Sequence, residues 1–418
     1  MAKEIKIITK NWEIPNISDI ESYLNNGGYL ALKKVLREMS PSEVLSEVKI
    51  SGLNGRGGAG FLVGKKWELA KEQKTKEKYF ICNLDESEPG NFKDRLIGER
   101  NPHQLIEGII ISCYAIGAQK AFIYLNGKFK QLERILKIAI EACYKEGLLG
   151  RSIMGFAFDL ELEIFCGAGA YICGEESALV ASISGQRGEP SVRPPFPCQC
   201  GLDGKPTVVN NAETIANLPW IIKNGGKKFS LIGMKESPGT KLVCLDGSVK
   251  KPGVYEIPIG FSVEEVINNQ GGGIKPGTEF WFAQVGGASG NLVPAKFLGE
   301  MPSYAKTSKI PLGTGSILVF DKFQDIKKIM LSWINFFQRE SCGKCVPCRE
   351  GTFRLKSILE RLADNQIDRN DLEDLEKLIW TLDHTTFCAL GKFSVNAIKD
   401  VIRYGFCPEL ASGKENNF

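Results

Sequence analysis

The first half of the chain alternates between two hydrophobic periods. Short apolar runs at 79–82, 121–124 and 160–165 have the length of buried strands, whereas 105–116 and 131–146 have the spacing and length of helices. Strands that alternate with helices are typical of a mostly parallel sheet covered by helices. This part of the chain is therefore predicted to be an α/β domain.

The pattern changes twice beyond this domain. Residues 229–320 hold short strand-like runs around a single helical segment at 262–269, which indicates a small α+β module. The four runs are 242–245, 253–257, 280–285 and 316–320. From 327 to 403, leucine and isoleucine recur at helical spacing, which predicts an all-helical bundle.

Residues at the start of the chain also look helical, with an apolar stripe that is broken at Ser40-Pro41. A length of 418 residues suggests about three domains. We expect an N-terminal helical extension at 1–48, an α/β domain at 49–228, an α+β module at 229–325 and a C-terminal helical bundle at 326–418.

A glycine-rich stretch lies at the start of the α/β domain. Gly52, Gly55, Gly57, Gly58 and Gly60 fall within nine residues, so few Cβ atoms keep a ligand away from the backbone. A helix is expected directly afterwards, and a loop of bare amides that leads into a helix N-terminus can cradle a phosphate. Three of these glycines also fit the G-x-G-x-x-G spacing of dinucleotide-binding loops. A flexible surface loop is the alternative.

Four polar side chains follow the strand predicted at 79–82. Asn83, Asp85, Glu86 and Glu88 would emerge at its carboxyl end, where ligands of open α/β sheets bind. Amides and carboxylates there can bind the edge of a heterocycle or the hydroxyls of ribose or ribitol. Paired glycosidase-type carboxylates and a solvated acidic turn are the alternatives. The nearby glycine stretch favours a nucleotide.

A second segment of small residues repeats this arrangement at 167–170. It is followed by Tyr171 and by Glu175 and Glu176 at the start of a predicted helix. Glutamates at a helix start can also simply favour the helix macrodipole. We treat the three side chains as candidate ligand contacts.

Two further segments offer ligand contacts. The proline-rich stretch 187–197 is a rigid loop that offers Arg193 to a phosphate and Phe196 as a stacking face. Asn210 and Asn211 add two amides just before a predicted helix at 212–223, where N-capping is the alternative role.

The predicted bundle contains a cysteine cluster. Cys342, Cys345 and Cys348 form Cys-x-x-Cys-x-x-Cys, which matches the first three ligands of a ferredoxin-type iron-sulfur run. The fourth ligand has to come from elsewhere, and Cys388 and Cys407 are both candidates. Zinc bound by four thiolates is the alternative. A triple with one distant partner fits a cubane cluster better.

The remaining cysteines and the histidines give no second site. Cys166, Cys173, Cys198 and Cys200 match no common metal-binding spacing, and we expect buried structural cysteines. The chain has only two histidines, so we expect neither a histidine-based metal site nor a serine-type triad.

Charge and hydropathy argue against nucleic acid as a partner and against insertion into a membrane. The 53 Lys and Arg residues are scattered and nearly balanced by 49 Asp and Glu, so no nucleic acid is expected to bind. The longest apolar run, 105–118, is too short to span a bilayer, and residues 1–10 lack the apolar core of a signal peptide. We expect a cytoplasmic protein that reaches a membrane only through partners.

Four motifs together resemble the NADH-binding, flavin-bearing subunit of respiratory complex I, the NADH-quinone oxidoreductase. They are Gly-Arg-Gly-Gly-Ala-Gly-Phe at 55–61, Asn-Leu-Asp-Glu-Ser-Glu-Pro-Gly at 83–90, Gly-Ala-Gly-Ala-Tyr-Ile-Cys-Gly-Glu-Glu at 167–176 and Glu-Ser-Cys-Gly-Lys-Cys-Val-Pro-Cys-Arg-Glu-Gly at 340–351. The resemblance implies a Rossmann-like domain that holds FMN and NADH in one cavity, a ubiquitin-like SLBB-type module and a helical bundle with a 4Fe-4S cluster.

The resemblance also implies roles for individual residues. The implied FMN contacts are Gly55, Arg56, Gly57, Lys66, Asn83, Asp85, Asn210 and Asn211. The implied NADH contacts are Phe61, Glu88, Tyr171, Glu175, Glu176, Arg193 and Phe196. The implied cluster ligands are Cys342, Cys345, Cys348 and Cys388. Thr-Thr-Phe-Cys-Ala-Leu-Gly around Cys388 is similar to the family's fourth-ligand loop, which favours Cys388 over Cys407.

The activity that the resemblance implies is that of an NADH dehydrogenase. FMN would take a hydride from NADH and pass single electrons through the cluster toward quinone, with no catalytic side chain. The implied partners are a thioredoxin-like 2Fe-2S subunit and the larger iron-sulfur subunit of complex I, at the periphery of the inner membrane. The nearest alternative is the diaphorase subunit of a soluble NAD-linked hydrogenase or formate dehydrogenase. A non-catalytic zinc scaffold is an alternative from another class.

Overall fold

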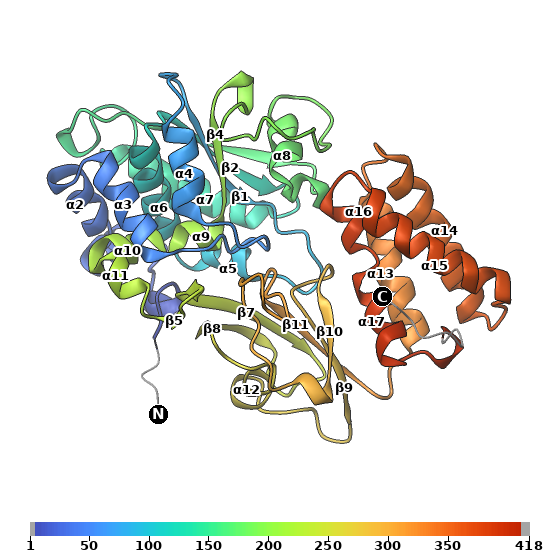
Figure 1. Cartoon of the computed structure of the whole chain (residues 1–418). Helices are drawn as coiled ribbons and strands as arrows, with labels where there is room; N and C mark the ends of the chain where they lie inside the picture. Colours follow the sequence, from blue (N-terminus) through green and yellow to red (C-terminus); the bar gives the residue numbers. More distant parts are fainter. Residues whose placement is uncertain (1–4, 411–418) are drawn as a thin grey trace.

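The computed structural model describes residues 5–410. Three bodies lie side by side in Figure 1: a helix-covered parallel sheet, a smaller five-stranded module and a helical bundle near the C-terminus. This order confirms the predicted fold class of an α/β domain followed by an α+β module and a bundle.

Three short helices open the described chain. They are α1 (Ile20–Asn25), α2 (Leu30–Glu38) and α3 (Pro41–Ser51). Helix α3 begins where the apolar stripe breaks, because Ser40 and Glu43 form a capping box and Pro41 occupies the first turn. The buried faces of α2 and α3 join the same hydrophobic core as the parallel sheet.

The larger sheet is entirely parallel. Its strands β1 (Tyr79–Leu84), β2 (Lys120–Asn126), β3 (Glu161–Gly167) and β4 (Thr207–Asn211) lie in the order β3-β2-β1-β4. Helices α4 (Val63–Lys71), α5 (Lys93–Arg100), α6 (Pro102–Ile116), α7 (Lys130–Lys145), α8 (Glu176–Ile183), α9 (Ala212–Ala216), α10 (Leu218–Asn224) and α11 (Gly226–Phe229) complete this part. The apolar run in α6 is a buried core helix.

Strand β4 was not predicted from the sequence. Its segment is short and ends in two asparagines, so its hydrophobic signal is weak. It pairs with β1 on the side opposite β2, which places Asn83 directly beside Asn211 at the carboxyl ends of the two strands. From β1 the chain builds β2 and β3 on one side, and it then crosses back to add β4 on the other side, so the topological switch point lies between β1 and β4.

The five-stranded module has the order β10-β9-β11-β7-β8. Its strands are β7 (Thr240–Gly247), β8 (Gly253–Pro258), β9 (Phe280–Val285), β10 (Asn291–Pro294) and β11 (Ser316–Asp321). Four of them were predicted, and β10 is additional. The predicted helix at 262–269 is α12 (Val263–Glu265), which continues as a π-turn. A two-stranded ribbon, β5 (Gly233–Met234) and β6 (Ser237–Pro238), precedes the module.

The C-terminal bundle confirms the predicted helical region. It consists of α13 (Ile326–Glu340), α14 (Val346–Ala363), α15 (Arg369–Thr385), α16 (Ala389–Phe393) and α17 (Asn396–Tyr404). Its apolar stripes form a second core that includes Phe282 and Phe320 of the module, whose rings stack 4.8 Å apart. The module and the bundle are therefore packed together.

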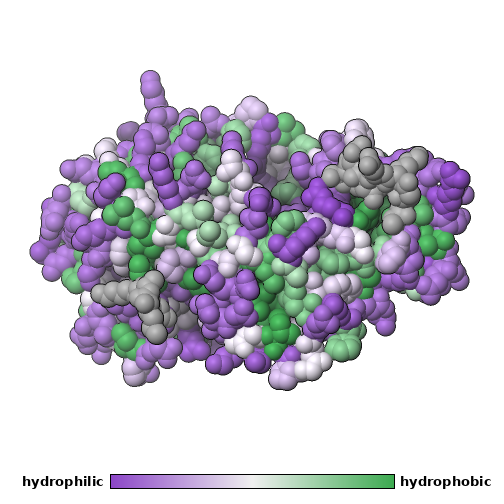
Figure 2. All heavy atoms as spheres, turned by 60° about the horizontal axis from the view of Figure 1, so that its bottom comes forward, coloured by the Kyte–Doolittle hydropathy of each residue, from purple (hydrophilic) through white to green (hydrophobic). Residues whose placement is uncertain are grey.

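One face of the molecule carries both polar and apolar residues. In Figure 2, with the bottom of Figure 1 turned forward, hydrophilic residues dominate the rim and hydrophobic residues gather toward the middle. Within residues 5–410, no helix combines the length and the apolar character needed to cross a membrane.

Candidate functional site

The glycine-rich loop is seated on the carboxyl end of β4. A Cβ atom at Gly57 would lie 3.0 Å from Cβ of Asn211, so the loop backbone touches this strand end closely. The backbone amide of Arg56 donates to Thr214 Oγ1 over 2.8 Å. Two residues of the helix that follows, Lys66 and Trp67, donate to the Val209 carbonyl and to Asn210 Oδ1. The loop therefore lies at the switch point, where such a sheet binds ligands.

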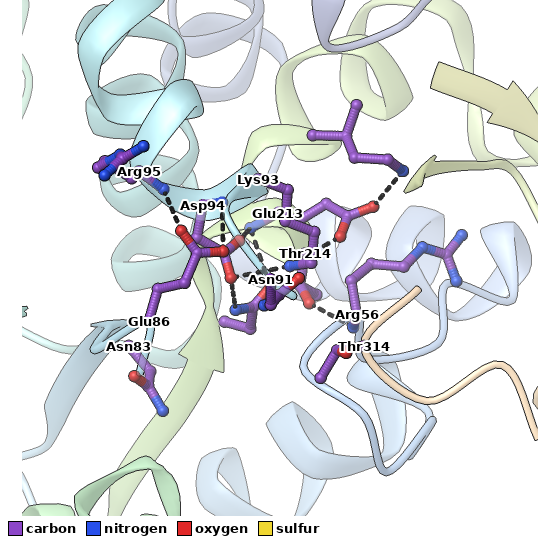
Figure 3. A network of polar contacts seen from close by, with 12 residues as sticks. Arg56, Asn83, Glu86, Asn91, Lys93, Asp94, Arg95, Glu213, Thr214 and Thr314 are labelled. Atoms are coloured by element: carbon purple, nitrogen blue, oxygen red, sulfur yellow. Dashed lines mark hydrogen bonds and ion pairs between the residues drawn. The ribbon is translucent and has the colours of Figure 1, made fainter. Parts of the chain in front are cut away.

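The side chain of Arg56 is directed toward Pro238 and Tyr304. It is completely buried, donates to the carbonyl of Pro238 over 2.6 Å and lies over the Tyr304 ring at 5.4 Å. In Figure 3 its guanidinium points away from Thr214. Burial lowers the pKa of Arg56. The side chain of Arg56 is therefore engaged within the protein.

The end of β1 presents Asn83 and Asp85. Asn83 donates through Nδ2 to the Gly174 carbonyl at 3.1 Å and accepts the backbone amide of Asp85 at 3.0 Å. Asp85 Oδ1 accepts from Ser87, whereas its buried Oδ2 has no hydrogen-bond partner within residues 5–410. Burial raises the pKa of Asp85 to about 6. A buried carboxylate oxygen without a partner suits the hydroxyl donors of a ribitol or ribose chain.

Glu86 has a different role from its neighbours. Its two carboxylate oxygens accept the backbone amides of Asp94 and Arg95, both at 2.9 Å, and so hold the start of α5. Burial and the nearby Asp94 raise the pKa of Glu86 to about 7. This carboxylate is therefore occupied within the protein.

A buried ionic network lies at the end of β4 and the start of α9. Lys93 Nζ lies 2.8 Å from Asp94 and 2.9 Å from Glu213, and these three side chains point toward one another in Figure 3. Asn211 donates to Asp94 at 2.8 Å and caps α9 by accepting from the Glu213 amide. The N-capping alternative for Asn211 is thus present, and Asn210 bonds to an indole. Sequence reasoning missed the network, because its members lie in ordinary-looking polar stretches.

Glu88 and Tyr171 lie where all three bodies meet. The Tyr171 hydroxyl is 3.4 Å from Glu88 Oε1, and the Tyr171 backbone amide donates to Glu340 of α13 at 2.8 Å. The Tyr171 ring packs edge-on against Phe336, with centroids 5.1 Å apart. Burial raises the pKa of both Glu88 and Tyr171.

A charged cluster lines the other side of the glycine loop. Lys66 Nζ lies 2.8 Å from Glu176, and Arg193 pairs with Glu175 and, at 3.7 Å, with Glu176. Glu175 also caps α8 through the amides at its first turn. The arginine is therefore engaged by carboxylates rather than free for a phosphate.

Two aromatic rings beside these groups face solvent. Phe61 follows the glycine loop and is 47% exposed, and Phe196 is 45% exposed. Arg193 lies over the Phe196 ring at 5.9 Å. Exposed rings of this size are available to stack on a planar ligand.

The four cysteines predicted as ligands line one small cavity. Cys342 follows α13, Cys345 and Cys348 begin α14, and Cys388 precedes α16. Burial, with the neighbouring thiols, raises the pKa of Cys348 to about 11. Thiols that crowd one another in this way fit a positively charged iron-sulfur centre, which binds thiolates.

The other cysteines are elsewhere. Cys407 does not line the cavity and lies 3.3 Å from Glu409. Cys173 and Cys198 are buried as expected, but Cys166 and Cys200 are exposed, so the expectation was wrong for these two. Cys166 lies on the edge strand β3, where alternate side chains face solvent, and Cys200 lies in a loop.

One short segment contacts both the residues after β1 and the cavity that the cysteines line. Residues Tyr171–Gly174 form a 3-10 turn in which Tyr171 contacts Glu88, Ile172 lines the cysteine cavity and the Gly174 carbonyl accepts from Asn83. This turn therefore joins the carboxyl end of β1 to the cavity that the cysteines line.

A glycine-rich loop at the switch point of an open parallel sheet, next to a small cavity lined by four cysteines, is the arrangement expected of an iron-sulfur flavoprotein oxidoreductase. Residues 48–220 match the Nuo51 FMN-binding domain, 242–291 an SLBB domain and 328–411 the iron-sulfur binding region of NADH-ubiquinone oxidoreductase-F. The chain belongs to the family of NADH-binding flavoprotein subunits of NADH-quinone oxidoreductase. Its cofactors are FMN and a 4Fe-4S cluster with NADH as substrate, which excludes the zinc scaffold.

The relatives cover almost the whole chain. The F subunit of the NADH-quinone oxidoreductase of Aquifex aeolicus is 44% identical over 95% of this chain and 92% of its own length. The HndC subunit of the NADP-reducing hydrogenase of Solidesulfovibrio fructosivorans is 42% identical over 95% of this chain and 81% of its own. A crystal structure of an NAD+-reducing [NiFe]-hydrogenase in the H2-reduced state superposes with a TM-score of 0.85 and 35% identity, covering 95% of this chain and 67% of that one.

Proposed function

We propose that the chain is the NADH-oxidising subunit of an NADH-quinone oxidoreductase complex. The observation that carries this proposal is the turn Tyr171–Gly174, which binds Asn83 at the end of β1 and also lines the cysteine cavity. When bound, FMN takes a hydride from NADH and the 4Fe-4S cluster receives its electrons one at a time. The work of the protein is to bring the two cofactors close and to hold NADH against the flavin.

The residues around the glycine loop are proposed to hold FMN. Gly55, Arg56 and Gly57 would bring the loop backbone close to the phosphate, with Lys66 as the nearby cation. The amides of Gly55 and Arg56 already donate to the Phe61 carbonyl and to Thr214 Oγ1, so the amide donors would come from Gly57 onward. The amide and carboxylate groups of Asn83, Asp85, Asn210 and Asn211 lie at the two strand ends. The unpartnered oxygen of Asp85 supports its role as an acceptor for a hydroxyl of the flavin side chain.

The exposed rings and the charged cluster are proposed to bind NADH. Phe61 and Phe196 would stack on the nucleotide, and Tyr171 and Glu88 would border the nicotinamide. Glu175 and Glu176 pair with Arg193 in the structure, so nucleotide binding would exchange these ion pairs for contacts with ribose and phosphate.

The cluster ligands are proposed to be Cys342, Cys345, Cys348 and Cys388. All four line one cavity, whereas Cys407 does not. The domain boundaries after residues 48, 228 and 325 stay a prediction, and so do the partners. These are a thioredoxin-like 2Fe-2S subunit and a larger iron-sulfur subunit, at the cytoplasmic periphery of the inner membrane.

A second candidate is the diaphorase subunit of a soluble hydrogenase. The identity to HndC and the superposition on an NAD+-reducing hydrogenase favour it. Both candidates would transfer a hydride between flavin and a nicotinamide nucleotide. The hydrogenase relatives are named for reducing that nucleotide, so the candidates differ in the direction of transfer and in the protein that exchanges electrons with the cluster. Co-purification of the tagged chain from its own organism distinguishes a quinone-reducing complex from a hydrogenase.

The proposed chemistry is tested by spectroscopy of the purified full-length chain. Flavin absorption bands and a broad iron-sulfur shoulder are expected, and anaerobic NADH should bleach the flavin and produce the EPR signal of a reduced 4Fe-4S cluster. A colourless protein that contains zinc would contradict the proposal.

A further inference from the structure

The loop between β9 and β10 of the five-stranded module contacts Glu88, a proposed NADH contact. This loop, Gly286–Gly290, places Ser289 against Glu88: the Ser289 hydroxyl lies 3.0 Å and its backbone amide 3.3 Å from Glu88 Oε1. Gly287 adopts a φ of +96°, and a Cβ atom there would clash with the same carboxylate. The module therefore contacts the Glu88 carboxylate through Gly287 and Ser289.

The loop that carries Ser289 is itself held from two sides. Gln284 of β9 donates to the Ala288 carbonyl at 3.2 Å, and Asn396 at the start of α17 donates to the Ser289 carbonyl at 3.0 Å. Asp400 of α17 accepts from the first residues of β10. A serine fixed in this way can orient a carboxylate without moving itself.

Glu88 needs such support because it is only 7% exposed. Burial disfavours its charged form, and hydrogen bonds from Ser289, Thr314 and Tyr171 oppose that effect. The groups that face it are these hydroxyls, from three different segments. A further carboxylate, Glu340 of α13, accepts the backbone amide of Tyr171 at 2.8 Å.

We propose that Ser289 is a positioning residue for the nicotinamide nucleotide site: its hydroxyl and amide hold Glu88 in place in the charged form, so that the five-stranded module takes part in nucleotide binding. This inference rests on the proposed role of Glu88 as an NADH contact. A charged Glu88 repels the phosphates of the nucleotide, so nucleotide affinity should weaken as pH rises through its ionisation.

The test is the pH dependence of KM for NADH and of inhibition by NAD+, measured on the full-length chain with both cofactors and an artificial one-electron acceptor. Ser289→Ala removes one hydrogen bond to the carboxylate. It should move the inflection of the wild-type profile upward by about one pH unit, a tenfold change in proton affinity. Ser289→Thr keeps the hydroxyl and should restore the wild-type inflection.

Two controls separate the possible failures. Glu88→Gln should remove the inflection altogether, and Ser308→Ala, which deletes a module hydroxyl that donates to the Ile310 carbonyl, should leave it in place. If Glu88→Gln changes the profile but Ser289→Ala does not, the role of Ser289 is refuted while that of Glu88 stands. A higher KM in Ser289→Ala without a shifted inflection also refutes it. Unchanged constants in Glu88→Gln refute the nucleotide role of Glu88 itself.

Discussion

Glu213 of α9 and Lys241 of β7 form an ion pair between the parallel-sheet unit and the five-stranded module, and both side chains are completely buried. Glu213 Oε1 accepts the backbone amide of Leu242 at 2.8 Å, and Lys93 Nζ lies 2.9 Å from Glu213 Oε2. Because Asp94 of the same network binds Asn211, the junction of the two bodies lies directly behind the glycine loop.

We predict that Glu213→Gln destabilises the chain by about 3–5 kcal/mol, because it leaves Lys93 and Lys241 buried without their shared carboxylate. Urea unfolding followed by circular dichroism measures the change. A loss below about 1 kcal/mol would show that the network relaxes or admits water.

An exposed ion pair of the same module supplies the control. Lys309 lies 2.6 Å from Glu300, but its side chain is 72% exposed. Lys309→Met should therefore change the free energy of unfolding by less than about 1 kcal/mol.

His103 gives a second prediction, for stability against pH. It is buried beside Tyr29, whose hydroxyl lies 3.0 Å from Nδ1, and burial lowers the pKa of His103 from 6.5 to about 4. Between these values the unfolded chain binds a proton that the folded chain does not. Stability should therefore fall as pH falls through this window, by up to about 3 kcal/mol from this residue.

The raised pKa values of Asp85 and Glu86 act in the opposite sense, since their folded forms bind protons more tightly. A comparison with His103→Asn, which keeps an acceptor for Tyr29, isolates the histidine. The melting temperature of the wild type should drop more steeply than that of the variant between pH 6.5 and 4. Parallel curves would mean that His103 stays accessible to protons.

The sequence predicts the layers of this fold because most elements have a strong period. Strand β4 escaped prediction, since two valines between a proline and two asparagines carry little periodic signal. That strand matters most for the site, because it turns Asn83 and Asn211 into neighbours. Sheet order is decided by contacts between distant segments, which a local pattern does not contain.

The candidate site was also predicted only in part. Spacing and motif resemblance select the cysteines and the glycine loop, which the structure gathers at two adjacent places. They do not reveal that Arg56 points into the module or that Ser289 contacts Glu88 across more than two hundred residues. Such partners are set by how the bodies pack, and no residue near Ser289 marks it in advance.

The close approach of the glycine loop to β4 gives a third prediction. Gly57→Ala adds a Cβ atom 3.0 Å from Asn211 Cβ, so the loop has to move by a few tenths of an ångström. FMN affinity of the apoprotein, measured by flavin fluorescence titration, should fall about tenfold or more, which is about 1.4 kcal/mol. Gly299→Ala is the matched control, because a Cβ atom there meets no neighbour within 4 Å. Equal affinity in both variants would place the flavin phosphate outside the loop.

The last prediction concerns the fourth cluster ligand. Cys388 lines the cavity with the three motif cysteines, whereas Cys407 lies outside it and beside Glu409. Burial raises the pKa of the Cys388 thiol, and the amides of Leu390 and Gly391 partly oppose that shift. Cys388→Ala should therefore abolish the EPR signal of the reduced cluster and lower its iron content, while the FMN absorption bands persist. Cys407→Ala removes a buried thiol of the bundle core and should lower stability without loss of the EPR signal. The opposite pattern of signals would reassign the ligand to Cys407 and require the C-terminal turn to rearrange around the cluster.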